Sequence, residues 1–507
     1  MYRTFPAQKD AYITDRIIQS RRATGGNTGR AGTMDIFKLY GVSQSGSVQL
    51  NELSRALIQF DISEISSHMS ASGRSWSDAS FKAHLKLFDV YSGHPTPANF
   101  SLVIIPVSQS WDEGTGRDVA TFKDLTACNF LTASYSGSPI GWHVSGANGK
   151  GLLGSADIDV ITSGNLGAGI ATLMMSQSFT VGDENLYVDV TTLVSAALAG
   201  LIPNYGYRIS FIESEENDGR TRFVKRFASR HASDKSKHPK LVVRWDDSLQ
   251  NDRNNLTFDA SGTIRLFNHY VGGLRNIVSG AALSQLTGLN CMKVRLETPV
   301  SGGLFSATFD ASQVQAGTSW LDGTYAATIA LPSSNSQLMP QIHKSGSVTF
   351  KEIWTSVDNT LGFHTGTFVM YPQDTQAFGL LPVQHRVNVV NCSDLYRDDE
   401  SPIMRVFVQK VSPNLPAKKI PVVATSHIPS EAHFSVRDAI SNEVIIPFDE
   451  TYNSTRMSTD SSGLTFRLYM DTLVVGRTYA IDVMIKEGPA RTTYRDASRR
   501  FTIEESA

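Results

Sequence analysis

The stretch from Leu186 to Trp245 decides the fold, because it holds four short segments of strand-like pattern. They read L-Y-V-D-V-T-T-L-V (186–194), N-Y-G-Y-R-I-S-F (204–211), R-F-V-K-R-F-A-S-R-H-A-S (222–233) and H-P-K-L-V-V-R-W (238–245). In the first segment Leu186, Val188 and Val190 alternate with more polar side chains, and the second segment alternates in the same way. A period of two places one set of side chains on one face of a sheet. The stretch therefore predicts the closing strands of a β-sandwich.

The rest of the chain has the same character. Short apolar or alternating segments are separated by turn residues, among them 39 glycines in 507 residues. Helical periodicity is rare, with candidates at 54–60, 122–125 and 191–201, and no short fixed-period repeat indicates a solenoid or propeller. We predict an all-β fold, in which an N-terminal jelly-roll β-sandwich is followed by two smaller immunoglobulin-like β-sandwiches.

A polar run after Trp245 marks the first domain boundary. It reads D-D-S-L-Q-N-D-R-N-N (246–255), which is typical of a linker. A second set of strand-like segments follows it, and a third begins near Gln384. The phrase L-V-V-G-R-T-Y (473–479) resembles the late strands of immunoglobulin-like modules. The predicted domains are therefore 1–247, 248–384 and 385–507.

Composition excludes several classes of function. The formal net charge is −2, so no overall charge directs the chain to nucleic acid or to a membrane surface. No apolar run approaches the roughly 18 residues of a spanning helix, and the first residues lack the apolar segment of a signal peptide. Cys128, Cys291 and Cys392 are far apart and form no cluster with histidines, so neither a disulfide framework nor a zinc site is predicted. We expect folding in a reducing cytoplasm.

The first 245 residues contain an ordered series of short phrases that resemble those of a known family. The phrases are A-Y-I (11–13), N-T-G-R-A-G (27–32), S-R-A-L-I-Q-F-D-I (54–62), the strand-like segments 81–90 and 100–107, S-W-D-E-G (110–114), G-W (141–142), L-Y-V-D-V-T-T-L-V (186–194), N-Y-G-Y (204–207), F-A-S-R (227–230) and P-K-L-V-V (239–243). In this order they resemble the DNRLRE family of jelly-roll, carbohydrate-binding-module-like domains. The resemblance implies the fold, whereas function depends on the sites that a fold carries.

Longer phrases narrow the resemblance. They are A-Y-I-T-D-R-I-I (11–18), A-G-T-M-D-I-F-K-L-Y (31–40), L-S-R-A-L-I-Q-F-D-I (53–62) and R-F-V-K-R-F-A-S-R-H (222–231). Together they resemble a version of the domain found in structural proteins of large contractile-tailed bacteriophages, although the strict D-N-R-L-R-E signature is absent and nothing matches beyond about residue 247.

This resemblance implies a non-enzymatic structural protein of the virion, made in the host cytoplasm and placed at the periphery of the tail, neck or baseplate. Its partners would be other virion proteins and further copies of the chain, with no nucleic acid and no membrane insertion. The alternative is a carbohydrate-binding or adhesion module of the host-recognition apparatus, which would bind a host-surface glycan.

Motifs of catalysis are absent from the sequence. There is no G-x-S-x-G, no H-E-x-x-H and no complete phosphate loop, although G-A-N-G-K-G (146–151) comes near to one. Groups of neighbouring acids lie in turn-like surroundings, as at Asp112/Glu113, at Glu213, Glu215 and Glu216, and at Asp398, Asp399 and Glu400. We therefore predict no catalytic residue and no cofactor, while carboxylates that assemble across strands leave a hydrolase open. Structural calcium held by Asp112, Asp118 and Asp189 is a second open alternative.

Two sets of residues are candidates for binding. Arg222, Lys225, Arg226 and Arg230 form a basic cluster, and the acids beside it favour a structural or protein-interface role over nucleic acid. Ion pairs at the rim of the sandwich are the alternative for Arg55 and Arg230. Trp76, Trp111 and Trp142 are candidates for stacking on a sugar ring. Core or rim packing is the alternative for Trp111 and Trp142, whereas Trp76 lies in a polar phrase typical of a loop.

Overall fold

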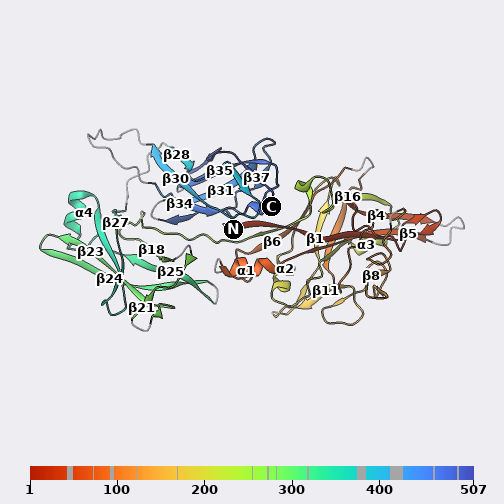
Figure 1. Cartoon of the computed structure of the whole chain (residues 1–507), viewed down its shortest axis with the longest axis horizontal. Helices are drawn as coiled ribbons and strands as arrows, with labels where there is room; N and C mark the ends of the chain where they lie inside the picture. Colours follow the sequence, from red (N-terminus) through yellow and green to blue (C-terminus); the bar gives the residue numbers. More distant parts are fainter. Residues whose placement is uncertain are drawn as a thin grey trace. The chain divides into compact units, whose positions relative to one another are not determined.

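Strands far outnumber helices in the structure, a computed structural model, and the prediction of an all-β, multi-domain fold is confirmed (Figure 1). The structure describes the chain except residues 43–48, 72–73, 92–95, 122, 168, 254, 271–272, 281–282, 317–318, 374–383, 412–425, 461–462, 488–489 and 507. Contacts divide the chain into an N-terminal unit of Arg3–Ser66 and Phe81–Arg244, and a C-terminal unit of Met1–Tyr2, Ser67–Ser80 and Trp245–Ala507.

A ten-stranded sheet builds the N-terminal unit. Its order is β13-β7-β15-β5-β1-β17-β6-β14, and β4 pairs with both β5 and β16. The strands are β1 (Tyr2–Thr14), β4 (Thr33–Val42), β5 (Gln49–Phe60), β6 (Lys82–Leu87), β7 (Phe100–Pro106), β13 (Met175–Phe179), β14 (Leu186–Asp189), β15 (Tyr207–Phe211), β16 (Arg222–Ala228) and β17 (Lys240–Arg244).

The alternation expected of the closing strands holds for one strand and not for another. In β14 the side chains of Leu186 and Val188 are buried, and those of Tyr187 and Asp189 are exposed. In β15 every residue is buried, including Arg208 and Ser210, which a half-exposed strand would place in solvent. A polar loop that covers this face explains the difference, and its contacts with Arg208 are described below.

The side chain of Gln177 bridges the two ends of the ten-stranded sheet. Its Nε2 donates to the carbonyl oxygen of Asn185 at 2.9 Å, and its Oε1 accepts from the backbone N–H of Tyr187 at 2.7 Å. Gln177 belongs to β13, and Tyr187 to β14, which are the two outer strands of the order. One amide side chain thus takes the place of strand-to-strand hydrogen bonds, and the sheet is nearly closed.

Short elements complete this unit. The short strands are β2 (Ile17–Ile18), β3 (Arg21–Arg22), β8 (Thr132–Tyr135), β9 (Pro139–Gly141), β10 (Lys150–Leu152), β11 (Val160–Asn165) and β12 (Ile170–Thr172). The helices of this part of the chain are α1 (Ser63–Ala71), α2 (Thr191–Leu198), α3 (Glu213–Glu216) and η1 (Lys235–Lys237). The helix predicted at 191–201 is therefore confirmed as α2. The one predicted at 54–60 is wrong, because pairing with β1 and β15 holds that segment in β5. The segment 122–125 begins outside the described residues.

A single antiparallel sheet forms the part of the C-terminal unit that follows the linker. Its order is β18-β25-β24-β23-β26-β27, and Phe258 N–H donates to the carbonyl oxygen of Tyr371 at 2.8 Å, which brings the end of β27 back beside the segment before β18. The sheet encloses a core centred on Phe350. Its strands are β18 (Ser261–Phe267), β23 (Met292–Val300), β24 (Gly303–Ala316), β25 (Ser319–Ala330), β26 (Val348–Thr355) and β27 (Gly362–Met370). The smaller elements are β19 (His269–Tyr270), β20 (Gly273–Leu274), β21 (Val278–Ser279), β22 (Ser284–Gln285) and α4 (Met339–Ser345).

Two sheets form the last part of the chain, as an immunoglobulin-like sandwich requires. One has the order β28-β30-β34-β33, and the other β29-β37-β35-β31-β32 with β36 beside β35. The strands are β28 (Gln384–Val389), β29 (Leu395–Arg397), β30 (Ile403–Val411), β31 (Glu431–Asp438), β32 (Val444–Ile446), β33 (Ser458–Asp460), β34 (Gly463–Arg467), β35 (Thr478–Glu487), β36 (Ala490–Tyr494) and β37 (Phe501–Glu504), with the helical turn η2 (Met470–Thr472).

The phrase at 473–479 forms the tyrosine corner of such sandwiches. Tyr479, near the start of β35, accepts a hydrogen bond at its hydroxyl from Val474 N–H at 2.8 Å and lies 3.1 Å from the Val474 carbonyl oxygen. The ring is fully buried. A tyrosine hydroxyl bonded to backbone a few residues upstream fixes the turn that leads into the strand.

Candidate functional site

The basic cluster predicted at an interface is instead paired with acids of the same unit. Arg222 binds Asp218 through both terminal nitrogens, at 2.9 and 2.8 Å. Arg226 binds both oxygens of Asp35 through Nε and Nη2, at 2.6 and 2.5 Å. A bidentate guanidinium–carboxylate pair satisfies both groups, so these charges are not free for a partner's acid.

Lys225 is the most enclosed member of the cluster. Its ammonium donates to Asp89 Oδ1 at 2.6 Å and to the carbonyl oxygens of Gly182 and Glu184 at 2.7 and 2.8 Å. The side chain has no exposed area. All three ammonium protons are therefore used inside the unit, so Lys225 has the structural role that was one of the two alternatives for the cluster. The alternation of charged and apolar residues in β16 does not reveal this burial, because the partners of Lys225 and Arg226 come from distant segments of the chain.

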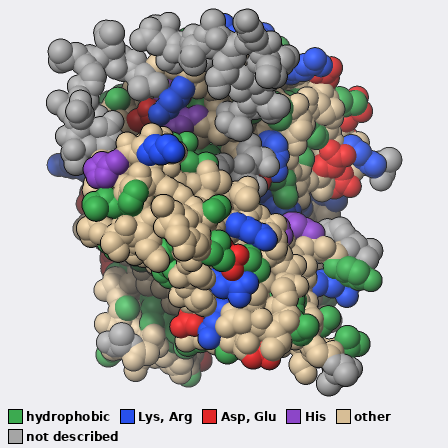
Figure 2. Space-filling model, turned by 90° about the vertical axis from the view of Figure 1, so that its left-hand side faces the viewer, with side chains coloured by type: hydrophobic (Ala, Val, Ile, Leu, Met, Phe, Trp, Pro, Cys, Tyr) green, Lys and Arg blue, Asp and Glu red, His purple; other side chains and the backbone are tan. Residues whose placement is uncertain are grey.

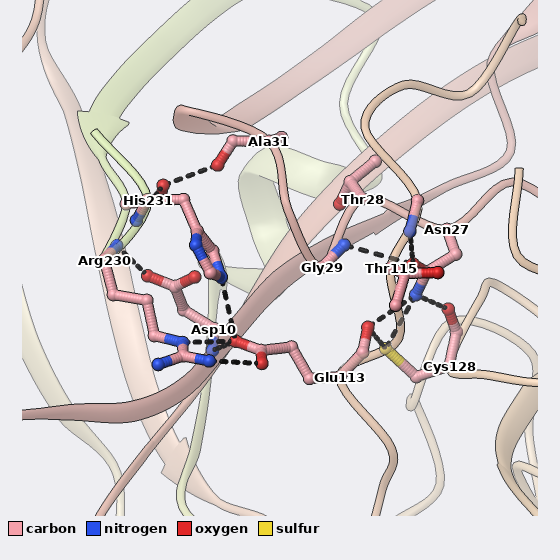
Figure 3. A network of polar contacts seen from close by, with 12 residues as sticks. Asp10, Asn27, Thr28, Gly29, Ala31, Glu113, Thr115, Cys128, Arg230 and His231 are labelled. Carbon is pink, nitrogen blue, oxygen red and sulfur yellow. Dashed lines mark hydrogen bonds and ion pairs between the residues drawn. The ribbon is translucent and has the colours of Figure 1, made fainter. Parts of the chain in front are cut away.

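Arg230 is the centre of the network drawn in Figure 3. Its Nε and Nη2 donate to the two carboxylate oxygens of Glu113 at 2.6 and 2.7 Å, and its backbone N–H donates to Asp10 Oδ2 at 2.5 Å. Asp10 N–H in turn donates to Glu113 Oε1 at 2.9 Å. The strand that contains A-Y-I (11–13) thus meets the phrases S-W-D-E-G (110–114) and F-A-S-R (227–230). The ion-pair alternative for Arg230 is the one that the structure has.

Asp10 carries an unusual protonation equilibrium in this network. Its side chain is almost completely buried, and burial raises the pKa of Asp10 from 3.8 to about 7. The hydrogen bond from Arg230 N–H lowers this pKa, and the charge of Glu113 raises it, by smaller amounts. Loss of solvation dominates because a carboxylate in a low-dielectric environment loses its hydration. Asp10 is therefore partly protonated near neutral pH.

Asn27 holds the loop that presents Glu113. Its Nδ2 donates to the carbonyl oxygens of Glu113 and Cys128 at 2.7 and 2.8 Å, and its Oδ1 accepts from Gly116 N–H at 2.8 Å (Figure 3). The approach is so close that a Cβ on Gly29 would lie 2.1 Å from the carbonyl oxygen of Glu113. The phrases N-T-G-R-A-G (27–32) and S-W-D-E-G (110–114) thus form two halves of one clamp. Their close approach explains why position 29 is a glycine. Cys128 is buried in this clamp, and burial raises the pKa of its thiol.

Asp10, Glu113 and His231 each offer one metal-ligating atom, and these atoms lie within 4.8 Å of one another. His231 Nε2 is 3.8 Å from Glu113 Oε1, and burial together with Arg230 lowers the pKa of His231. The Arg230 guanidinium already occupies both oxygens of Glu113. The arrangement therefore has its cation built in, and it serves to hold three segments together.

A second buried ion pair supports the loop that resembles a phosphate loop. Arg55 binds both oxygens of Glu216 at 2.8 and 2.7 Å and donates from Nη1 to the carbonyl oxygen of Gly146 at 2.7 Å. Arg208 donates to the carbonyl oxygen of Ala147 at 2.8 Å. The neighbouring Arg55 lowers the pKa of Glu216 against the effect of burial, which raises it. The loop therefore points its carbonyl oxygens at arginines, which is the opposite of the N–H groups that cradle a phosphate.

Asp159 was not predicted, although it organises the same loop. Its carboxylate accepts from the backbone N–H groups of His143, Val144 and Gly149 at 2.7, 3.0 and 2.6 Å. The side chain is fully buried. Its sequence context, S-A-D-I-D-V (155–160), gives no signal of this role.

The tryptophans separate into two groups. Trp111 and Trp142 are 1% and 7% exposed, belong to one core cluster, and donate from Nε1 to the carbonyl oxygens of Tyr205 and Asn129. Neither ring offers a face to a sugar, so the glycan-stacking prediction is wrong for both, and the core-packing alternative holds. Trp76 lies in a turn and is half-buried, and its role stays a prediction.

The three aspartates considered for calcium are used separately. Asp112 accepts from Tyr135 N–H at 2.9 Å, Asp118 from Ala120 N–H at 2.7 Å, and Asp189 from Thr191 N–H at 2.8 Å. Each carboxylate thus closes a local turn or fixes a neighbouring strand. Within the described part of the chain they do not gather into one group of ligands.

Charges of both signs are interspersed among the described side chains that Figure 2 draws, so the visible face carries no field of a single sign. In the described part of the chain, no helix combines the length and the apolar character that crossing a membrane requires.

Comparisons with known proteins add no identity. No family model matches the chain, and no curated protein matches it. Among solved structures, the chain is similar to a protein from Corynebacterium diphtheriae described as membrane anchored, with 8% identity over 99% of this chain and 97% of the other, at a TM-score of 0.15. It is also similar to the native conformation of E. coli alpha-2-macroglobulin, with 8% identity over 99% of this chain and 35% of the other, at a TM-score of 0.13. Scores this low carry no argument about fold or function.

Proposed function

We propose that this chain is a non-enzymatic structural protein of a tailed-bacteriophage particle, where it docks at the periphery of the tail, neck or baseplate and displays its β-modules. One observation supports the non-enzymatic part above all. Several charged side chains of the N-terminal unit are held in ion pairs with one another, namely Arg230–Glu113, Arg55–Glu216 and Lys225–Asp89. The virion part rests on the ordered phrases that resemble the phage version of the domain.

Exposed apolar side chains supply a surface for docking. Leu131, Tyr135 and Ile140 lie at or beside the hairpin of β8 and β9, and each is more than two-fifths exposed. Figure 1 labels β8, which locates this hairpin in the N-terminal unit. Exposed apolar side chains that lie together in one patch are typical of interaction sites, whereas single ones are common on any protein surface. The partners would be other virion proteins, and symmetric particles would bring together many copies of the chain.

The experiment is a comparison of particles that carry variant chains. Mass spectrometry of purified particles is expected to detect the chain, and cryo-electron microscopy to place it at the tail, neck or baseplate. Ile140→Asp is expected to lower its copy number at least about tenfold, because a buried carboxylate opposes docking. Val181→Asp, at another exposed apolar position of the unit, is the matched control and should be incorporated normally. Absence of the wild-type chain from particles would overturn the proposal.

The alternative function, a carbohydrate-binding or adhesion module, now depends on Trp76. Glycan-array binding that disappears in Trp76→Ala and persists in Tyr187→Ala, a second accessible aromatic position, would favour it. Turnover of a polysaccharide that a single carboxylate substitution abolishes would contradict the non-enzymatic proposal altogether.

A further inference from the structure

Three side chains capable of binding a metal meet in the C-terminal sandwich, at a place where its two sheets approach each other. His385 lies in β28 and Glu487 at the end of β35, which belong to different sheets. His427 lies in the segment before β31, and its N–H donates to the carbonyl oxygen of Val408 in β30 at 2.7 Å. Strand pairing therefore fixes the backbone of His385 and Glu487, and one backbone hydrogen bond to β30 holds that of His427. Groups on strands are better positioned than groups on free loops.

The distances within this trio suit a shared ligand. His427 Nε2 lies 2.6 Å from Glu487 Oε1, and His385 Nε2 lies 3.6 Å from the same oxygen. The two imidazole rings are parallel, with centroids 5.6 Å apart and an interplanar angle of 6°. One ligand atom from each residue lies within 4.8 Å of the other two. Ligands at about 2.0–2.1 Å from a tetrahedral zinc ion stand about 3.3 Å apart, so small side-chain movements suffice to admit the ion.

His385 supplies an independent sign that a ligand belongs here. Its side chain is 3% exposed, and its Nε2 has no hydrogen-bond partner although it faces Glu487. Its other ring nitrogen, Nδ1, lies 3.2 Å from the hydroxyl oxygen of Tyr494. A histidine that binds a metal through Nε2 carries its proton on Nδ1 and donates it to an outer partner. The Tyr494 hydroxyl oxygen is placed to accept this hydrogen bond from Nδ1. Without a metal, the buried Nε2 of His385 is left without a partner, which costs free energy.

We propose that His385 Nε2, His427 Nε2 and a carboxylate oxygen of Glu487 bind one divalent transition-metal ion of the zinc type, with water in the fourth position. Two imidazoles and one carboxylate form a donor set that suits zinc and related ions and that calcium or magnesium does not favour. Because the ligands come from both sheets, the ion would join them across the sandwich. The inference does not depend on the proposed virion function.

Among the residues that the structure describes, Lys410 is a charged neighbour that opposes the ion. Its Nζ lies 3.6 Å from Glu487 Oε1, and its side chain is 46% exposed. A flexible, exposed ammonium group can turn into solvent when a divalent ion takes its place, at little cost. Lys410→Gln is therefore expected to tighten metal binding, which a role of Glu487 confined to ion pairing would not explain.

The test is a titration of the full-length protein, stripped of metal with a chelator, with zinc chloride alone in a buffer that does not bind zinc. Isothermal titration calorimetry is expected to show one zinc ion per chain, and scanning calorimetry a zinc-dependent rise in unfolding temperature. His385→Ala and His427→Gln should abolish this binding, and Tyr494→Phe should weaken it about tenfold through loss of the outer hydrogen bond. His269→Ala, at an exposed histidine of β19, and His231→Ala, in the other trio, are the controls and should bind zinc as the wild type does.

Circular dichroism of the metal-free variants checks that each one folds. If His385→Ala fails to fold, Tyr494→Phe and Glu487→Gln still provide the test. The inference is overturned if the wild type takes up no zinc at about 100 μM zinc chloride, a concentration well above the dissociation constants expected of three-ligand protein sites. It is also overturned if zinc binds equally well to the wild type and to folded variants of His385, His427 and Glu487.

Discussion

The N-terminal unit and the C-terminal sandwich each contain a trio of acids and histidines, yet the trios differ in where their positive charge comes from. In the first, which consists of Asp10, Glu113 and His231, Arg230 binds both carboxylate oxygens of Glu113. In the second, the Glu487 carboxylate has Lys410 no nearer than 3.6 Å, and a buried imidazole nitrogen of His385 has no hydrogen-bond partner. Proximity of ligand atoms alone therefore does not identify a metal site.

The difference concerns which cation satisfies the carboxylate. A guanidinium attached to the chain is always present, so it stabilises the fold at any metal concentration. A trio without such a group either holds a weak ion pair or takes its cation from solution. Four substitutions test whether this distinction holds.

Removing a built-in guanidinium from the deepest pair should cost most. Arg55→Met leaves the carboxylate of Glu216, which is 5% exposed, without its partner. We expect a loss of about 3–5 kcal/mol in the free energy of unfolding, measured by chemical denaturation. Arg21→Met, at an exposed position of β3, is the control and should change little. A loss below about 1 kcal/mol would show that the built-in cation matters less than we argue.

Asp10 should make the stability of the N-terminal unit depend on pH. Its folded-state pKa of about 7 lies above the ordinary 3.8, so between these values the folded chain binds a proton that the unfolded chain has lost. Stability from this group is therefore present at low pH and falls by about 1 kcal/mol per pH unit as pH rises toward 7. In Asp10→Asn this fall should disappear, as denaturation at pH 5, 6, 7 and 8 would reveal.

Asn keeps an oxygen that can accept from Arg230 N–H, so Asp10→Asn should fold. Asp183→Asn, at an exposed position, should leave the pH profile of the wild type unchanged. An unchanged profile in Asp10→Asn would mean that the buried carboxyl is ionised throughout this range.

Arg230→Met tests the trio itself and should have an intermediate effect. Arg230 is one-third exposed at its side chain, so water partly compensates Glu113 when the guanidinium is lost. We expect a loss of about 2 kcal/mol, smaller than for Arg55→Met. A combined Arg230→Met and Glu113→Gln variant should recover part of it, which a double-mutant cycle measures. Strictly additive losses would show that the two side chains do not act as a pair.

Glu487→Gln should have the smallest effect when no metal is present. Glu487 and His427 are each about one-fifth to one-quarter exposed at the side chain, and partly exposed pairs contribute less than about 1 kcal/mol. In zinc chloride the same substitution should lower the unfolding temperature relative to the wild type by clearly more. Equal losses with and without zinc would remove the contrast between the two trios.

Much of the fold follows from local pattern, and much of the site does not. The alternation in β14, the helix at Thr191 and the phrase before Tyr479 are short-range signals, and the structure has what they predict. The burial of Trp111 and of Arg208 depends on loops that fold over them from elsewhere, which periodicity cannot show. A charged residue in a strand predicts a solvent-facing position only when no distant acid covers it.

The metal trio illustrates the same limit. A search for closely spaced cysteines and histidines finds nothing around His385, His427 and Glu487, because the residues lie in three different segments of the sandwich. Only the pairing of β28 and of β35 with their neighbours brings them together. Sequence spacing reveals sites that one loop or helix carries, whereas sites assembled between sheets require the fold.

The amide of Gln177 has a consequence for the behaviour of many chains at once. Outer strands with free backbone groups invite the strands of other molecules, which leads to exchange of segments or to aggregation. By satisfying Asn185 and Tyr187 from within the chain, Gln177 leaves fewer such groups at the seam of the sheet. Crowded copies can then lie side by side at high local concentration, each keeping its own strands.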